Sequence, residues 1–136
     1  MRPHAFPKAE HLCLRREIEG LFSAGSRAAS AYPVRAVYRL AERTAGPPVK
    51  VLVSVSKRHL HRAVDRNRAK RQLREAYRLH KELLQGVAAP GKCLHLGFIW
   101  LADRPAATAA VEASVVRLLQ RVAEKLHPDA PVPEEP

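Results

Sequence analysis

Residues Val53 to Lys81, VSVSKRHLHRAVDRNRAKRQLREAYRLHK, decide both the fold and the chemistry of this 136-residue chain. The run begins as an apolar strand and continues as a helix rich in basic residues. It holds ten Lys and Arg side chains, and the acids in it or beside it are Asp65, Glu75 and Glu82. With Glu82 counted, this stretch carries +7 of the formal net charge of +11. This concentration of cations predicts a polyanionic partner, because binding to many fixed cations releases the counterions of a phosphate chain.

In the helical part of this run, the inward-facing residues and the basic residues lie on different sides of the helix. At about 100° per residue, the inward-facing residues cluster within one arc of the helix. They are Ala69, Leu73, Ala76, His80 and Leu83. The adjoining arc holds Arg66, Asn67, Lys70, Arg71, Arg74, Arg78 and Lys81. We expect a helix with one buried side and a row of cations. Asp65 is expected to act as N-cap or to favour the positive end of the helix, and Gly86 to close the helix.

Patterns of helix and strand flank this run on both sides. The flanking elements are an amphipathic helix over Leu12–Ser23 that Gly25 stops, strands over 32–40, 49–56 and 94–101, and a closing helix over 106–126. The order α-β-β-α-β-α predicts an α/β (α+β) two-layer sandwich, with helices over a small sheet. Trp100 is expected to fill the core. Residues 1–126 are expected to form one domain, and the Pro-rich, acidic tail 127–136 to be flexible.

Composition excludes several classes of protein. Hydrophobic residues make up 46% of the chain, which is ordinary for a globular protein and argues against wholesale disorder. No stretch approaches the length of a membrane span, and the N-terminus lacks the apolar region of a secretion signal. Cys13 and Cys93 lack metal-ligand spacing, so we expect reduced, buried thiols in a cytosolic protein. A pI near 10.5 leaves RNA, DNA and anionic membrane open as partners at this level.

Two motifs sharpen the choice among these partners. V-S-x-S-K runs from Val53 to Lys57, and R-N-R-x-K-R-x-x-R-E runs from Arg66 to Glu75. With L-F-x-x-G at residues 21–25 and the closing strand and helix, they make the chain resemble the protein subunit of bacterial ribonuclease P. The resemblance covers roughly residues 12–126 and is strongest in the central quarter.

The resemblance implies a fold and a mode of action. The strand-helix-strand crossover of the family is left-handed, a rare exception to the usual hand, and the fold is similar to a ribosomal protein domain and to a domain of elongation factor G. Family members bind the catalytic ribonuclease P RNA and the 5′ leader of precursor tRNA. The RNA cleaves the leader with metal-bound water, so the resemblance implies Mg²⁺ required by the RNA and no catalytic or metal-binding residue in the protein. We expect a cytoplasmic 1:1 ribonucleoprotein with a monomeric protein and no membrane contact.

The resemblance also implies two sets of site residues. The RNA-binding set is Lys57, Arg58, Arg62, Arg66, Asn67, Arg68, Lys70, Arg71, Arg74 and Arg78. The second set lines a leader cleft between the sheet and the first helix, and consists of Phe22, Tyr38, Ser54 and Ile18. The chain departs from the family where Ile18 and Pro33 replace usual aromatics. Phe22 and Tyr38 are then the main stacking side chains, each worth about 1–3 kcal/mol per stacked base.

Each set also has a simpler structural interpretation. A run of charges is usually a solvated helix face, and Phe22, Tyr38 and Ser54 can equally serve core packing. His59 and His61 look like a metal pair or an acid/base pair. However, residues two apart share a face only in an extended strand, and no third ligand or carboxylate stands at suitable spacing. We expect them in a solvated or phosphate-facing loop.

Three other functions stay open on the sequence. One is a self-sufficient ribonuclease that uses His59 or His61 with Lys57. Another is a ribosomal or assembly protein of the same fold with no role in cleavage. A DNA-binding regulator is disfavoured, because the chain lacks a recognisable helix-turn-helix pair and a dimer signal.

Overall fold

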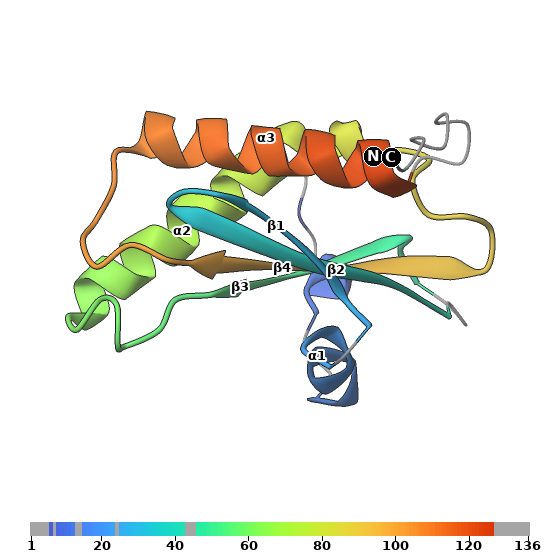
Figure 1. The fold of residues 1–136 in the computed structure, drawn as a ribbon, viewed down its shortest axis with the longest axis horizontal. Coiled ribbons are helices and arrows are strands. Elements are labelled where there is room, and N and C mark those ends of the chain that lie inside the picture. Colours follow the sequence, from blue (N-terminus) through green and yellow to red (C-terminus); the bar gives the residue numbers. More distant parts are fainter. Residues whose placement is uncertain (1–5, 7, 13–14, 24, 43–45, 127–136) are drawn as a thin grey trace, which may run out of the picture.

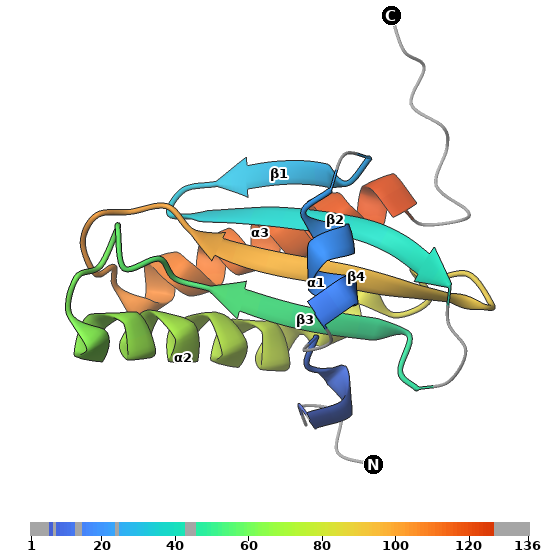
Figure 2. The same cartoon turned by 90° about the horizontal axis from the view of Figure 1, so that it is seen from below.

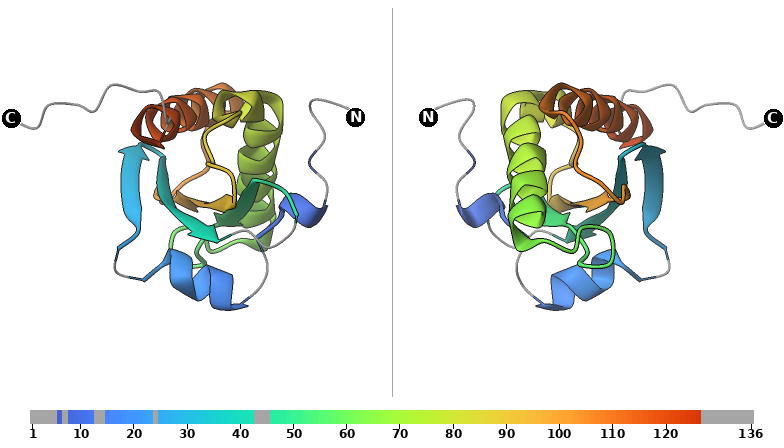
Figure 3. Two further views of the ribbon diagram at one scale, coloured as in Figure 1. Left: turned by 90° about the vertical axis from the view of Figure 1, so that its right-hand side faces the viewer. Right: turned by 90° about the vertical axis from the view of Figure 1, so that its left-hand side faces the viewer.

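The fold was taken from a computed structural model, which describes residues 6, 8–12, 15–23, 25–42 and 46–126. Two long helices, α2 (Ala63–His80) and α3 (Thr108–Leu126), cover one face of a four-stranded sheet. The short helix α1 (Arg15–Leu21) lies on the opposite face (Figure 1). End-on views show the same arrangement, with the helix pair above the sheet and α1 below it (Figure 3). The predicted α/β sandwich is confirmed, and the tail 127–136 and Cys13 lie outside the described residues.

The sheet is mixed, with strand order β1-β2-β4-β3. Its strands are β1 (Arg27–Ala31), β2 (Val34–Glu42), β3 (Val49–Ser54) and β4 (Lys92–Trp100). The β1–β2 and β2–β4 pairs are antiparallel, whereas β3 and β4 are parallel. Strand β1 was not predicted, because its sequence RAASA lacks the β-branched and aromatic residues that mark a strand. It forms through pairing with β2 along its whole length.

The crossover from β3 through α2 to β4 is left-handed, as the resemblance implied. Figure 2 views the sheet from the α1 side, with α2 behind it. Both strands run from right to left, and β4 lies above β3 (Figure 2). A chain that leaves β3, passes behind the sheet and returns in β4 therefore turns with the left-handed sense. Local periodicity carries no information on this hand.

The main core lies between the sheet and the α2–α3 layer. Its fully buried side chains include Leu73, Phe98, Trp100, Leu118 and Leu119. A second, smaller cluster lies under α1, where Leu12, Leu21 and Val37 are buried and Ile18, Leu52 and Ile99 pack against them. Strand β4 is buried along almost its whole length because it is central in the sheet and covered on both faces. Trp100 fills the core as predicted.

The boundaries of α2 differ from the prediction. The helix begins at Ala63, with Arg62 as N-cap, so the expectation that Asp65 caps it is wrong. Asp65 lies in the first turn, where its carboxylate favours the positive end of the helix, which is the other role that the sequence predicted for it. The helix ends at His80, a 3₁₀ turn over Lys81–Leu84 follows, and Gly86 adopts φ +76° beyond it. Among the described residues, no helix is both long and apolar enough to cross a membrane.

Candidate nucleic-acid interface

The basic side of α2 faces solvent. The helix buries Ala69, Leu73, Ala76 and Tyr77 against the sheet and α3. The predicted site residues Arg62, Asn67, Arg68, Arg71 and Arg74 are exposed, and Arg66, Lys70 and Arg78 are half-buried. The row of cations thus lies away from the core, as the periodicity predicted. We call these eight residues the α2 basic face.

The C-terminal end of this row is paired with acids. The Arg78 guanidinium donates to the Glu75 carboxylate, with Nε 3.1 Å from Oε2. This hydrogen bond lowers the pKa of Glu75 and raises the pKa of Arg78. Lys81 Nζ lies 2.9 Å from Glu10 Oε1, and both side chains are only 18% exposed. The prediction that Lys81 belongs to the exposed row is therefore wrong, because it joins the helix end to the N-terminal segment.

Strand β3 is followed by a loop, residues 55–62, that carries Lys57 and Arg58. Both are exposed, as predicted. The Ser56 carbonyl accepts hydrogen bonds from the Leu60 and His59 amides, and Ser56 Oγ accepts one from the Arg58 amide at 3.0 Å. The buried Leu60 anchors the loop in the main core. The loop therefore has a defined shape, although it has no regular secondary structure.

Arg66 makes the contacts that join this loop to α2. Its Nη1 atom donates to the Leu60 carbonyl at 2.9 Å and to the His61 carbonyl at 2.8 Å. The first arginine of the R-N-R motif thus binds protein backbone in this structure. The sequence offered no signal for these contacts.

His59 has a carboxylate partner that the sequence did not predict. Its Nδ1 atom lies 2.8 Å from Asp103 Oδ1, and Asp103 stands 44 residues away on the loop after β4. The expectation that no carboxylate is available to His59 is wrong, because the crossover brings the two loops together. His61 is exposed. Within the described part of the chain, no group of three or more His, Cys, Asp or Glu could hold a metal ion.

The face of the sheet that α1 covers contains three of the predicted cleft residues. Phe22 follows α1 and is 49% exposed. Ile18 packs against the small cluster, and Ser54 lies on the same face as Leu52, because side chains alternate along β3. Gly97 of β4 lies beneath this helix, and a Cβ atom there would stand 3.9 Å from Phe22 Cζ. Phe22, Ile18 and Ser54 thus share one face of the sheet.

Tyr38 does not belong to this cleft. It is 3% exposed and packs in the main core, on the face that α3 covers. Burial raises the pKa of its hydroxyl, although the nearby Arg27 lowers it. The prediction of Tyr38 as a cleft residue is wrong, because β2 turns its even-numbered side chains away from α1. Phe22 is the one aromatic of the predicted cleft on the α1 face.

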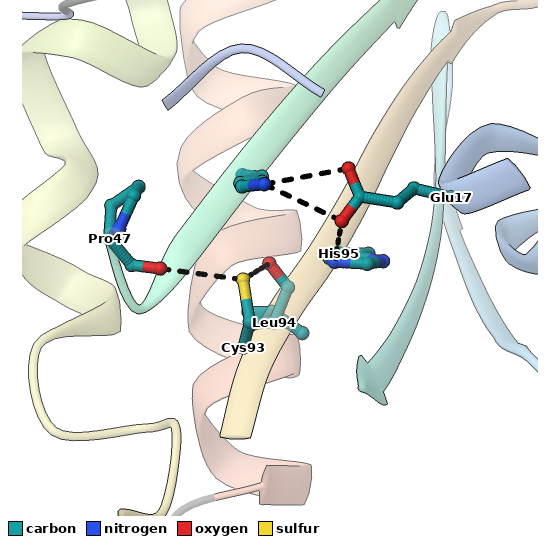
Figure 4. A network of polar contacts seen from close by, with 6 residues as sticks. Glu17, Pro47, Cys93, Leu94 and His95 are labelled. Atoms are coloured by element: carbon teal, nitrogen blue, oxygen red, sulfur yellow. Dashed lines mark hydrogen bonds and ion pairs between the residues drawn. The ribbon is translucent and has the colours of Figure 1, made fainter. Parts of the chain in front are cut away.

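A cluster of ionisable groups joins α1 to the sheet. The Glu17 carboxylate lies 3.5 Å from His95 Nε2 and 3.5 Å from Lys50 Nζ (Figure 4). Arg39 Nη1 donates to the Gly20 carbonyl at 2.9 Å. Burial lowers the pKa of His95 despite the opposing effect of Glu17. Sequence reasoning missed this cluster, and its one signal was a histidine within the apolar run LHLGFIWL.

The buried thiol of Cys93 lies on the same strand. Its Sγ atom is 3.5 Å from the Pro47 carbonyl oxygen (Figure 4). Cys93 is buried, as predicted.

The α2 basic face and the α1 face are connected around the edge of β3. Arg74 lines a hollow beside that strand together with Phe6, His11, Leu12 and residues 51–53. The amide of Leu12 donates to the Val51 carbonyl, so the N-terminal segment runs along the outer edge of β3. The hollow therefore lies between Arg74 of the α2 basic face and Leu12 and Leu52 of the cluster under α1.

The sequence of this chain is similar to those of one protein family. A sequence model of the family described as Ribonuclease P matches residues 6–126. The ribonuclease P protein component of Porphyromonas gingivalis is 40% identical over 117 residues, which cover 85% of each chain. That of Chlorobaculum tepidum is 40% identical over 85 residues, covering 61% of this chain and 55% of its own.

Solved structures share the fold. The ribonuclease P protein of Thermotoga maritima superposes with a TM-score of 0.62 at 20% identity, covering 82% of this chain and 96% of its own. The Staphylococcus aureus protein superposes with a TM-score of 0.61 at 19% identity, covering 88% and 99%. At this identity the likeness supports the fold alone.

Proposed function

The chain belongs to the ribonuclease P protein family, and on that premise we propose that it binds the RNA subunit and the precursor tRNA leader on two different faces. The α2 basic face and the loop bearing Lys57 and Arg58 bind ribonuclease P RNA. The α1 face around Phe22 binds the leader. The RNA subunit performs the cleavage that produces the 5′ end of mature tRNA.

The observation that carries the proposal is the composition of the exposed side of α2. Three of its predicted contact residues, Arg68, Arg71 and Arg74, are exposed cations on α2, and Arg62 is exposed at its N-cap. The acids of α2 are Asp65 in its first turn and Glu75, which pairs with Arg78. Arginine suits phosphate recognition, since its planar guanidinium forms two parallel hydrogen bonds to phosphate and stacks on bases. Such a surface attracts RNA and screens the repulsion between two RNA chains.

The proposed leader site offers little aromatic surface. Phe22 is half-exposed, Ile18 stands where the family commonly has an aromatic, and Tyr38 faces the core. Stacking on a single ring contributes about 1–3 kcal/mol. The leader is therefore held by its backbone and by one stacked base, with weak preference for base identity.

We further propose that the protein supplies no catalytic group. The Mg²⁺ that the reaction requires is held by the RNA, and the holoenzyme is a cytoplasmic complex of one protein and one RNA. His59 pairs with Asp103 as a general base would, so the His59 variant described below tests this part of the proposal. The protein then acts by raising affinity for substrate and by screening charge.

Reconstitution tests the proposal against its alternatives. The full-length protein is incubated with precursor tRNA at low Mg²⁺, with and without a bacterial ribonuclease P RNA. We expect cleavage only when the RNA is present, and faster cleavage when the protein is added. Cleavage by the protein alone would identify a protein nuclease, and absence of stimulation at any Mg²⁺ concentration would favour an assembly role. At saturating protein, His59→Ala/His61→Ala should retain most of the stimulation.

A further inference from the structure

The loop over residues 55–62 is held from two sides, and we propose that Arg66 and Asp103 are positioning residues that hold Lys57 and Arg58 at the RNA surface. The inference rests on the proposed RNA-binding function and deepens it. It reassigns Arg66, the first residue of the R-N-R motif, from direct phosphate contact to support of the neighbouring loop.

Arg66 forms the first of the two attachments. Its Nη1 atom donates to two successive carbonyls, those of Leu60 and His61, at 2.9 and 2.8 Å. Both hydrogens of that nitrogen are thereby directed into the loop. Charge-assisted hydrogen bonds of this length are among the stronger ones in proteins. The side chain is half-buried, in contrast to the exposed Arg68 and Arg71 further along the helix.

Asp103 forms the second attachment through His59. Its Oδ1 atom lies 2.8 Å from His59 Nδ1. The loop that carries Asp103 is itself joined to α2, because Gln72 Nε2 donates to the Ala106 carbonyl and to Thr108 Oγ1, each at 3.0 Å. Two loops and the first half of α2 thus form one hydrogen-bonded unit. Lys57 and Arg58 project from that unit.

The charge of Asp103 makes a positioning role and simple electrostatics predict opposite effects on RNA binding. Its side chain is 85% exposed and lies beside a loop with several cations. A carboxylate there repels an approaching phosphate chain, so electrostatics alone predicts tighter RNA binding when it is removed. The positioning role predicts the opposite sign, because the His59 attachment is lost.

The first test uses the affinity of the full-length protein for ribonuclease P RNA at fixed salt. Arg66→Lys keeps the charge but lacks the planar fork, and Arg66→Met lacks both. If Arg66 positions the loop, both variants bind about tenfold more weakly and to similar extents, the loss expected for one charge-assisted hydrogen bond. At the exposed Arg71, used as a matched direct contact, Arg71→Lys should lose less affinity than Arg71→Met, because the charge that attracts phosphate remains. Retention of affinity by Arg66→Lys, with loss in Arg66→Met, would overturn the proposal.

A double-mutant cycle identifies the groups that Arg66 supports. In a Lys57→Ala/Arg58→Ala background, Arg66→Lys should cost much less than in the wild type, because the loop then has no cations to present. Additive losses would overturn the proposal. Asp103→Ala should weaken RNA binding. Unchanged or tighter binding would show that Asp103 is not a positioning residue.

Hydrogen exchange in the absence of RNA separates this inference from the proposed function. Amides of residues 57–62 should exchange faster in Arg66→Lys, while those in β4 stay protected. Unchanged exchange in the loop would overturn the positioning role, whatever the RNA affinity. If the wild-type protein fails to bind ribonuclease P RNA, the proposed function fails, and the exchange data still report whether Arg66 orders the loop. Thermal unfolding of each variant checks that it is folded.

Discussion

Gly97 of β4 lies directly beneath Leu21 of α1, so closely that a Cβ atom on residue 97 would stand 3.0 Å from Leu21 Cδ2. Leu21 is fully buried, and it holds α1 against the sheet beside Phe22. The absence of a side chain at residue 97 therefore sets the height of α1 above the sheet. Because Phe22 follows α1, that height also sets the position of the proposed stacking ring.

Substitution of Gly97 should therefore lower stability and displace α1. We expect Gly97→Val to reduce the free energy of unfolding by about 1–3 kcal/mol, because a tightly packed site cannot take the added carbons without strain. Urea denaturation measures the change. Ala28→Val on the edge strand β1 is the matched control, since Ala28 is exposed and its change should stay within about 0.5 kcal/mol. Equal stability of the two variants would contradict the packing described here.

Phe22 and Tyr38 should differ sharply in their effect on leader binding. Phe22→Leu removes the exposed ring and should weaken binding of precursor tRNA by about 1 kcal/mol or more. Tyr38→Phe keeps the core packing and should leave that affinity unchanged. The measurement compares precursor tRNA with mature tRNA on the reconstituted holoenzyme. A loss confined to the Tyr38 variant would place the leader on the other face of the sheet.

Ile18→Phe should strengthen leader binding. The side chain lies on the α1 face near Phe22, and an aromatic there would provide a second stacking surface worth about 1 kcal/mol or more. Ile18→Leu keeps the apolar volume and serves as the control. If Ile18→Phe leaves the affinity for leader-containing substrate unchanged while RNA binding is intact, Ile18 does not line the leader site.

Arg71 should contribute one phosphate contact to RNA binding. We expect Arg71→Ala to reduce the slope of log affinity against log salt by about 0.7–0.9, because one fewer counterion is released. Arg117→Ala is the control, since Arg117 is also an exposed cation but lies on α3. An unchanged slope for Arg71→Ala, or an equal reduction for Arg117→Ala, would argue against the α2 basic face.

His95 should make stability fall in mild acid. Burial holds the folded-state pKa of His95 below the ordinary value of 6.5. Lys50 and Arg39 also lower this pKa, whereas Glu17 raises it. Folding thus favours the neutral imidazole. The stability that His95 contributes is fully present above pH 6.5 and is lost as the pH falls through the folded-state pKa. Urea denaturation from pH 7.5 to 5 should show a steeper decline for wild type than for His95→Gln. Parallel curves would contradict the shift.

Strong local periodicity was enough to predict α2 and β4. The 3.6-residue repeat of α2 separated Ala69 and Leu73 from Arg71 and Arg74, and the apolar run of β4 marked a central strand. Such patterns are local, because each depends on residues within a few turns or pleats of one another. Even there, Asp65 was misplaced as a cap, and the short β1 gave no signal.

Contacts between residues far apart in the chain became visible only in the three-dimensional structure. The left-handed crossover and the strand order brought Asp103 to His59 and Glu10 to Lys81, over separations of 44 and 71 residues. The position of α1 on one face of the sheet separated Phe22 from Tyr38. These outcomes depend on how the layers pack. The alternation of side chains along a strand predicts which residues share a face of the sheet, but not which face a helix covers. Which face a helix covers is set by the burial of the whole chain.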